Sequence, residues 1–235
     1  MLTGIIGAMA VETEAIKALI DTPVVEKAGN IEFVRGKLCG EDVVVAQCGI
    51  GKVFAAICAE AMILKYAPDR IINTGVAGTL SDKVGLLDIA VSSSVVEHDM
   101  DTSPLGDPVG LISGINIVNI PASDALVAEI SAAARRLGKK CTVGVIASGD
   151  QFIADKTTKN YIRDTFSAIA CEMEGAAIGH VCYVNGVDFA VIRCISDNAD
   201  DHAGAMDYPT LCQKAAEQSQ ALLTELLKST PYENH

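Results

Sequence analysis

The sequence contains no tryptophan, and aromatic residues make up only 4% of its 235 positions. Its core must therefore be built from Val, Ile, Leu and Ala, which a hydrophobic content of 50% supplies in quantity. No apolar run reaches the roughly 18 residues typical of a membrane-spanning helix, and Glu60 interrupts the longest helical candidate, 53–64. The length is within the range of one large α/β domain, so we expect residues 1–235 to form a single domain.

Positive charge is also scarce. The chain has 30 acidic residues but only 18 lysines and arginines, six of them arginines, and its net charge is −12. This balance opposes binding to the phosphates of nucleic acid or to an anionic membrane, and we expect neither as a partner. The amino-terminal segment carries Glu12 and Glu14 and no early basic cluster, so no signal peptide is predicted.

The eight cysteines include no C-x-x-C pair. Most of them lie inside apolar runs, where cysteine behaves as a small core residue. A disulfide framework is not expected at this length and composition. The pattern predicts a protein of the reducing cytoplasm.

Apolar runs of strand length alternate with longer segments of helical periodicity along the whole chain. The predicted strands are 2–7, 31–38, 43–48, 70–73, 89–96, 142–147 and 188–195, and the predicted helices are 11–20, 53–66, 124–137, 155–166 and 208–229. This alternation predicts an α/β protein, a three-layer α/β/α sandwich around a mixed sheet. The loop 102–114 is long and rich in Gly and Pro, and loops of that length are often functional.

Two carboxylates, Glu172 and Glu174, follow an apolar run and precede a helix of small residues. In a strand they would point to the same face of the sheet. They predict a site that binds hydroxyl groups or a cation. An equal alternative is a solvated strand-to-helix turn in which one Glu interacts favourably with the helix dipole. Arg193 is a lone charge in an apolar strand, and a buried arginine needs a carboxylate partner. Either of the two glutamates is the natural candidate.

Other segments allow a functional and a structural interpretation. The small residues 74–78 follow a strand end, where open α/β sheets bind ligands, but they also fit an ordinary tight turn. Phe152 lies in a loop and could stack on a flat ligand or cap the core. Glu12 could serve a helix dipole, and Asp197 could cap a turn or helix.

Two apparent motifs do not meet their templates. Gly49-Ile50-Gly51-Lys52 lacks the spacing of a P-loop, because Val53 follows the lysine, and Phe54 stands where a dinucleotide fingerprint needs glycine. The acidic segment 97–101 matches no zinc or helical ligand spacing. We expect no metal and no cofactor.

Six short segments resemble one family in order and in register. They are Gly4-Ile5-Ile6-Gly7-Ala8-Met9, Gly49-Ile50-Gly51-Lys52, Asn73-Thr74-Gly75-Val76-Ala77-Gly78, Ser148-Gly149-Asp150, Glu172-Met173-Glu174 and Ile195-Ser196-Asp197. Together they are similar to the 5′-methylthioadenosine/S-adenosylhomocysteine nucleosidases of the purine nucleoside phosphorylase superfamily, and the resemblance covers almost the whole chain. It implies a nucleoside phosphorylase-like fold with a partly barrel-like sheet. The implied activity is hydrolysis of the bond between adenine and the thio-substituted ribose, in methionine salvage and nucleoside catabolism.

The same resemblance implies roles for individual residues. Glu12 is the general base that activates water, and Asp197 is the general acid that protonates adenine N7. Glu174 holds the ribose hydroxyls, and Phe152 stacks on adenine. The full set of implied binding residues is Met9, Val76, Ala77, Gly78, Phe152, Ile153, Glu172, Met173, Glu174, Arg193 and Ser196, with Leu105 of the partner subunit.

The required chemistry supports these residue types independently. Cleavage of an N-glycosidic bond builds positive charge on the sugar and negative charge on the departing base, which carboxylates and an acid respectively stabilise. An aspartic acid with the ordinary pKa of about 3.9 is a poor acid near neutral pH. We therefore expect Asp197 to be held partly protonated, or to share a proton with the leaving base.

Two positions depart from the family pattern. Val76 stands where many relatives carry Ser, and the resemblance therefore implies that a hydrogen bond near the ribose or Asp197 is missing. Leu105 stands where some relatives place an aromatic residue. In the family this loop of one subunit closes over the 5′ substituent of the nucleoside bound in the other subunit, which implies a homodimer. The relative preference for methylthioadenosine, S-adenosylhomocysteine, 5′-deoxyadenosine or 6-amino-6-deoxyfutalosine is left open.

Two other functions compete with hydrolysis. A phosphorolytic nucleoside phosphorylase would need cationic clamps for phosphate, but the turn after the first strand offers Met9 and Glu12. A non-catalytic nucleoside-binding protein would not need both Glu12 and Asp197, and the presence of both argues against this function. We therefore expect a nucleoside and water as the bound partners.

Overall fold

The computed structural model describes residues 1–199 and 208–228. The strands are β1 (Leu2–Gly7), β2 (Asp21–Ala28), β3 (Ile31–Leu38), β4 (Glu41–Gln47), β5 (Arg70–Thr79), β6 (Ile89–Glu97), β7 (Ile120–Pro121), β8 (Cys141–Ser148), β9 (Ala168–Glu172) and β10 (Asp188–Asp197). The helices are α1 (Ala10–Lys17), α2 (Lys52–Tyr66), the short 3-10 helix η1 (Ser103–Leu105), α3 (Asp124–Arg136), α4 (Lys156–Phe166), α5 (Gly175–Asn185) and α6 (Tyr208–Lys228). Within these residues, no helix is both long and apolar enough to span a membrane.

The sheet closes on itself over part of its width. Strands β10, β6, β8, β9 and β5 pair in that order, and β5 also pairs with β10, which completes a ring. The sheet then continues from β5 through β1, β4, β3 and β2. Parallel pairs such as β1 with β5 occur beside antiparallel pairs such as β5 with β9. The predicted mixed, partly barrel-like sheet is confirmed.

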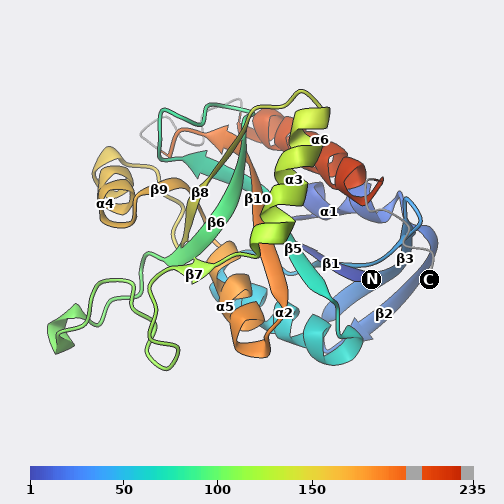
Figure 1. Cartoon of the computed structure of the whole chain (residues 1–235), viewed down its shortest axis with the longest axis horizontal. Helices are drawn as coiled ribbons and strands as arrows, with labels where there is room; N and C mark the ends of the chain where they lie inside the picture. Colours follow the sequence, from blue (N-terminus) through green and yellow to red (C-terminus); the bar gives the residue numbers. More distant parts are fainter. Residues whose placement is uncertain (200–207, 229–235) are drawn as a thin grey trace.

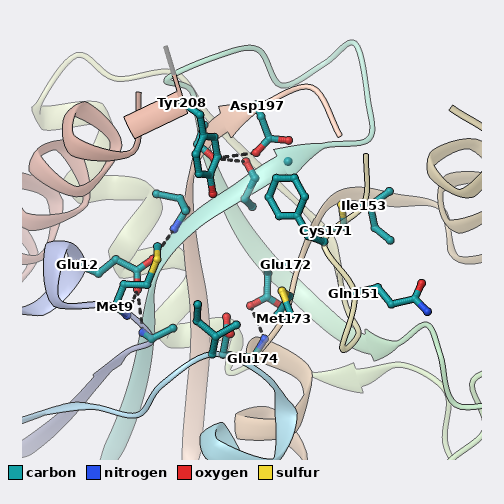
Figure 2. Close-up of a pocket in the computed structure, with 17 residues that line it drawn as sticks. Met9, Glu12, Gln151, Ile153, Cys171, Glu172, Met173, Glu174, Asp197 and Tyr208 are labelled. Carbon is teal, nitrogen blue, oxygen red and sulfur yellow. Dashed lines mark hydrogen bonds between the residues drawn. The ribbon is translucent and has the colours of Figure 1, made fainter. Parts of the chain in front are cut away.

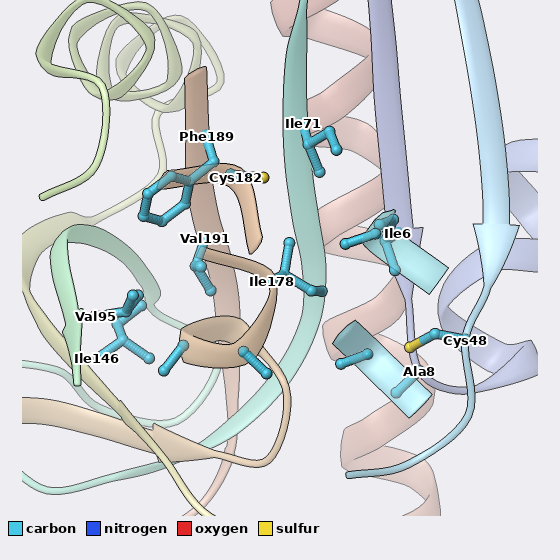
Figure 3. Close-up of a cluster of buried hydrophobic side chains, with 14 of the residues drawn as sticks. Ile6, Ala8, Cys48, Ile71, Val95, Ile146, Ile178, Cys182, Phe189 and Val191 are labelled. Atoms are coloured by element: carbon cyan, nitrogen blue, oxygen red, sulfur yellow. The ribbon is translucent and has the colours of Figure 1, made fainter. Parts of the chain in front are cut away.

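Helices cover the sheet from two sides, with α1, α3 and α6 on one side and α2 and α5 on the other (Figure 1). Side chains alternate faces along a strand, and the two cores follow this alternation. Ile5 and Ile72 pack with α1, α3 and α6, while their neighbours Ile6 and Ile71 pack toward α2 and α5 (Figure 3). The predicted three layers are therefore confirmed.

Strand β2 was not predicted from the sequence. Its residues are mostly exposed because β2 pairs only with β3 at the edge of the sheet, so no apolar alternation marks it. Pro23 is tolerated there because a sheet edge does not require every N–H to pair. The preceding helix ends at Lys17 rather than at the predicted residue 20.

Two strands extend further than predicted and carry site residues with them. β5 continues through Thr79, so the small residues 74–78 form the end of a strand and not a tight turn. β10 continues through Asp197 and pairs with β5 as far as Gly78. The loop around η1 projects from the body of the molecule on the side away from α6 (Figure 1).

Candidate active site

One pocket gathers most of the residues singled out in the sequence. It is open to solvent, and the space within it that water-sized molecules can reach is about 110 Å³. The end of β1, the carboxyl ends of β5, β9 and β10, the loop before α4 and the start of α6 surround it (Figure 2). The lining residues are Ala8, Met9, Glu12, Ile50, Val76, Ala77, Gly78, Gln151, Phe152, Ile153, Cys171, Glu172, Met173, Glu174, Ser196, Asp197 and Tyr208.

Glu12 is buried at one side of this pocket, in the first turn of α1. Its Oε2 accepts hydrogen bonds from the backbone N–H groups of Ala8 at 2.8 Å and Met9 at 2.9 Å. Its Oε1 accepts from the backbone N–H of Val76 at 3.1 Å. Burial raises the pKa of Glu12, although Arg193 and these N–H groups oppose the rise. A carboxylate with a raised pKa is a stronger base toward water.

Asp197 is buried at the end of β10, on the other side of the pocket (Figure 2). Its Oδ1 accepts a hydrogen bond from the backbone N–H of Ala199 at 2.8 Å. The Ser196 hydroxyl donates to its Oδ2 at 2.9 Å. These contacts fix the orientation of the carboxyl group toward the pocket.

Two glycines of β5 make room for these acids. A Cβ atom on Gly75 would lie 2.6 Å from Oε1 of Glu12, and one on Gly78 would lie 2.7 Å from Oδ1 of Asp197. Both carboxyl groups therefore pack against the same strand, and both line the same pocket.

Glu172 and Glu174 do not lie on one face of a strand as expected. β9 ends at Glu172, and Glu174 is the residue before α5 begins. Oε2 of Glu172 accepts from the N–H groups of Glu174 at 3.0 Å and Gly175 at 2.8 Å, so this carboxylate caps the helix. At this point the N–H groups of Glu174 and Gly175 donate to the Glu172 side chain and not to a neighbouring strand.

Arg193 lies beneath the pocket and is 1% exposed. Its Nη2 forms an ion pair with Oε2 of Glu172 and lies 4.0 Å from Oε2 of Glu174. The Asn73 amide oxygen accepts a further hydrogen bond from Nη2. The predicted carboxylate partner of Arg193 is thus Glu172, with Glu174 close by.

The pocket also has an aromatic wall. Phe152 is half exposed, and its ring meets the ring of Tyr208 at 5.8 Å between centroids and an angle of 85°. Such an edge-to-face pair holds each ring in a defined orientation. It leaves the Phe152 ring free to stack on a flat ligand.

The chain is similar to known proteins over nearly its whole length. The sequence profile of the phosphorylase superfamily matches residues 3–228. A protein of Shewanella halifaxensis named 5′-methylthioadenosine/S-adenosylhomocysteine nucleosidase is 42% identical over 230 residues, covering 97% of this chain and 99% of the relative. The chain belongs to this family of nucleosidases.

Solved structures of other nucleosidases share its fold. The nucleosidase of Neisseria meningitidis in complex with methylthio-immucillin-A superposes with a TM-score of 0.93 at 31% identity, covering 97% of this chain and 99% of that one. An aspartate-to-asparagine variant of the Helicobacter pylori nucleosidase, with 5′-methylthioadenosine in its active site, gives a TM-score of 0.92 at 34% identity, covering 97% and 98%. The expected nucleoside phosphorylase-like architecture is confirmed.

Two residues that the sequence assigned to the nucleosidase site do not line the pocket of their own chain. Arg193 lies below it, behind the glutamates that it pairs with. Leu105 is 83% exposed on η1, in the projecting loop. Its expected role concerns a partner subunit and stays a prediction.

Sequence reasoning also missed pocket residues of this nucleosidase. They are Ala8, Ile50, Gln151, Cys171 and Tyr208. Four of these lie inside or directly beside the quoted motifs, so only their direction was unknown. Tyr208 lies beside none of the quoted motifs. It lines the pocket from the first residue of α6, eleven positions after Asp197 in the chain.

Glu174 gives the nucleosidase a testable pH dependence of stability. Burial and the nearby Glu172 raise the pKa of Glu174 from 4.5 to about 7. The folded protein then binds this proton more tightly than the unfolded chain, so the free energy of unfolding falls as pH rises from about 4.5 to about 7. We expect Glu174→Gln to be more stable than wild type at pH 8, by up to about 3 kcal/mol.

Urea unfolding at pH 5 and pH 8 measures this difference. The glutamine can still accept the hydrogen bond that the Gly51 N–H donates to Oε1 of Glu174 at 2.8 Å. Glu32→Gln, at an exposed position of β3, is the matched control and should change little at either pH. An equal advantage for Glu174→Gln at both pH values would contradict the prediction.

Proposed function

We propose that this pocket hydrolyses the N-glycosidic bond of 5′-methylthioadenosine and S-adenosylhomocysteine, releasing adenine and the thioribose. In the proposal Glu12 activates the attacking water and Asp197 protonates adenine N7. The observation that carries it is the meeting of Glu12 and Asp197 in one pocket, against Gly75 and Gly78 of the same strand. A nucleoside bound there would reach both acids.

The electrostatics of the pocket agree with this chemistry. Positive charge develops on the sugar as the bond breaks, and Glu12, Glu172 and Glu174 surround the side of the pocket near α1 and α5. Asp197 lies across the pocket from Glu12 (Figure 2), and in the proposal the departing base stacks on Phe152 beside it. Sugar and base are thereby assigned to opposite ends of the pocket.

The remaining proposed contacts follow from this orientation. The ribose would lie against Met9, Met173, Glu174 and Val76, and adenine against Phe152, Ile153, Ala77 and Gly78, with Ser196 holding Asp197. The complexes of the Neisseria meningitidis and Helicobacter pylori nucleosidases with methylthio-immucillin-A and 5′-methylthioadenosine support the same class of ligand. Val76 contributes only its backbone N–H to Glu12.

Phosphorolysis is supported less well. Phosphate requires cationic or N–H clamps, and among the described residues the pocket lining includes no lysine and no arginine. The nearest guanidinium, Arg193, is already engaged by Glu172. Carboxylates in that position repel phosphate and suit water.

An adenine-release assay in phosphate-free buffer tests the proposal. The substrates are 5′-methylthioadenosine, S-adenosylhomocysteine, 5′-deoxyadenosine and 6-amino-6-deoxyfutalosine. We expect release of adenine from the first two without phosphate. Release that depends on added phosphate would establish a phosphorylase, and binding without release would establish a nucleoside-binding protein.

We further propose that residues 1–235 act as one domain in a cytoplasmic homodimer serving methionine salvage. α2 and the turn before it expose large apolar side chains, which are Ile50, Val53, Phe54, Ile57 and Leu64. We propose that a second copy covers this face and supplies Leu105 of the partner subunit to the pocket. The eight free thiols support a reducing compartment, and a monomeric mass in solution would contradict the dimer.

A further inference from the structure

Two segments that fit no nucleotide-binding or metal-binding template, 49–52 and 97–101, meet in the structure. The Lys52 ammonium, at the first turn of α2, lies between the carboxylates that end β6 and begin the loop after it. Its Nζ is 2.6 Å from Oδ1 of Asp99 and 3.1 Å from Oε2 of Glu97. The acidic segment 97–101 therefore binds the lysine of the glycine-rich segment 49–52.

A third segment closes this contact into a ring. The backbone N–H of Asp150 donates to Oδ2 of Asp99 at 2.9 Å. Oδ1 of Asp150 in turn accepts from the backbone N–H of Lys52 at 2.8 Å. We call Lys52, Asp99 and Asp150 the strap.

Each end of the strap adjoins a different half of the pocket. Gly51, directly before Lys52, donates its N–H to Oε1 of Glu174 at 2.8 Å, on the proposed ribose side. Asp150 directly precedes 151–153, which line the proposed adenine side. Gly51 has φ +99°, and a Cβ there would lie 3.0 Å from Oδ1 of Asp150, so only glycine fits the junction.

The charges of the strap are partly sheltered from solvent. The side chains of Lys52 and Asp99 are 17% and 26% exposed. Burial opposes charge on both groups, but their mutual contact outweighs it together with Glu97 at Lys52 and the Asp150 N–H at Asp99. The pKa of Lys52 is therefore raised and the pKa of Asp99 is lowered. Charge-assisted hydrogen bonds of this kind are stronger than neutral ones and weakly screened by salt.

We propose that Lys52 is a positioning residue for the nucleoside. Its side chain holds Asp99 and its backbone holds Asp150, so that the Gly51–Glu174 contact and 151–153 keep a fixed separation. A nucleoside must contact both halves at once, whereas free adenine contacts one. This inference rests on the proposed nucleosidase function of the pocket.

The test compares nucleoside and adenine binding in Lys52→Met, which removes the ammonium and keeps the apolar stem. We expect KM for 5′-methylthioadenosine to rise about tenfold, which corresponds to about 1.4 kcal/mol, with kcat within about threefold. The inhibition constant of adenine should change less than about twofold. Lys52→Arg should restore most of the loss in KM.

Asp99→Asn is the second variant and leaves the lysine in place. In the double variant, KM should rise no further than in Lys52→Met alone, because both substitutions remove the same contact. Lys37→Met, which breaks an exposed ion pair with Asp42, is the matched control and should leave KM unchanged.

Specific results would overturn the inference. One is an unchanged KM in folded Lys52→Met or Asp99→Asn. Another is a KM in the double variant that rises by the product of the two single effects. A third is equal weakening of adenine binding and nucleoside binding. If Lys52→Met does not fold, the KM of Asp99→Asn decides. A wild-type protein that releases no adenine would refute the nucleosidase proposal itself, which is a separate outcome.

Discussion

Asp197→Asn is expected to lower kcat for adenine release by about 10³-fold or more, while the protein folds normally. Asparagine has nearly the same shape, and its amide oxygen can still accept the hydrogen bond from the Ala199 N–H that Oδ1 accepts at 2.8 Å. It has no acidic proton to transfer to adenine N7. The departing base would then leave as an anion, which is the costly step that the acid relieves.

The measurement is single-turnover release of adenine from 5′-methylthioadenosine, beside thermal unfolding of the same sample. The variant should still bind the nucleoside, because only the proton is lost. Asp164→Asn, at an exposed position of α4, is the control and should keep full activity. An active Asp197→Asn enzyme would exclude Asp197 as the acid.

Glu12→Gln is expected to lower kcat by about 10²- to 10³-fold through loss of the general base. It carries a structural cost that Asp197→Asn does not. Both oxygens of Glu12 accept backbone N–H groups, from Ala8 and Met9 on one side and Val76 on the other. A glutamine side chain must turn its NH₂ toward one of these donors, which leaves a buried N–H unpaired at about 1–3 kcal/mol.

The pH profile separates the chemical effect of Glu12→Gln from this structural cost. Burial raises the pKa of Glu12, so the activity of the wild type should decline on the acidic side above the usual range of a glutamate. In Glu12→Gln that acidic limb should disappear. Glu14→Gln, two residues along α1 and 63% exposed, is the control that should keep both rate and profile. Persistence of the acidic limb in Glu12→Gln would assign it to another group.

Segments that bury apolar side chains could be predicted from the sequence. The alternation of apolar runs predicted the layered α/β fold because each of those segments buries at least one face. β2 escaped prediction because it buries almost nothing. The pairing of Arg193 with a glutamate followed from the cost of leaving a buried cation alone, which holds in any fold.

The sequence predicts the residue types of the site better than the directions in which their side chains point. Glu172 and Glu174 were expected on one strand face, but the start of α5 intervenes and turns Glu172 into a cap. Lys52 had no assigned partner, because Asp99 and Asp150 are far from it in the chain. Side chains reach such partners through strand order, which no local spacing encodes.

The sequence by itself determined the fold class, the family and the kinds of groups available for catalysis, because apolar periodicity and short motifs are local properties of the chain. Only the tertiary structure decided that Glu12 and Asp197 share one pocket and that Lys52 joins its two halves. The closed ring of β5, β9, β8, β6 and β10 brings distant strand ends together, and the order in which strands pair depends on contacts across the whole molecule.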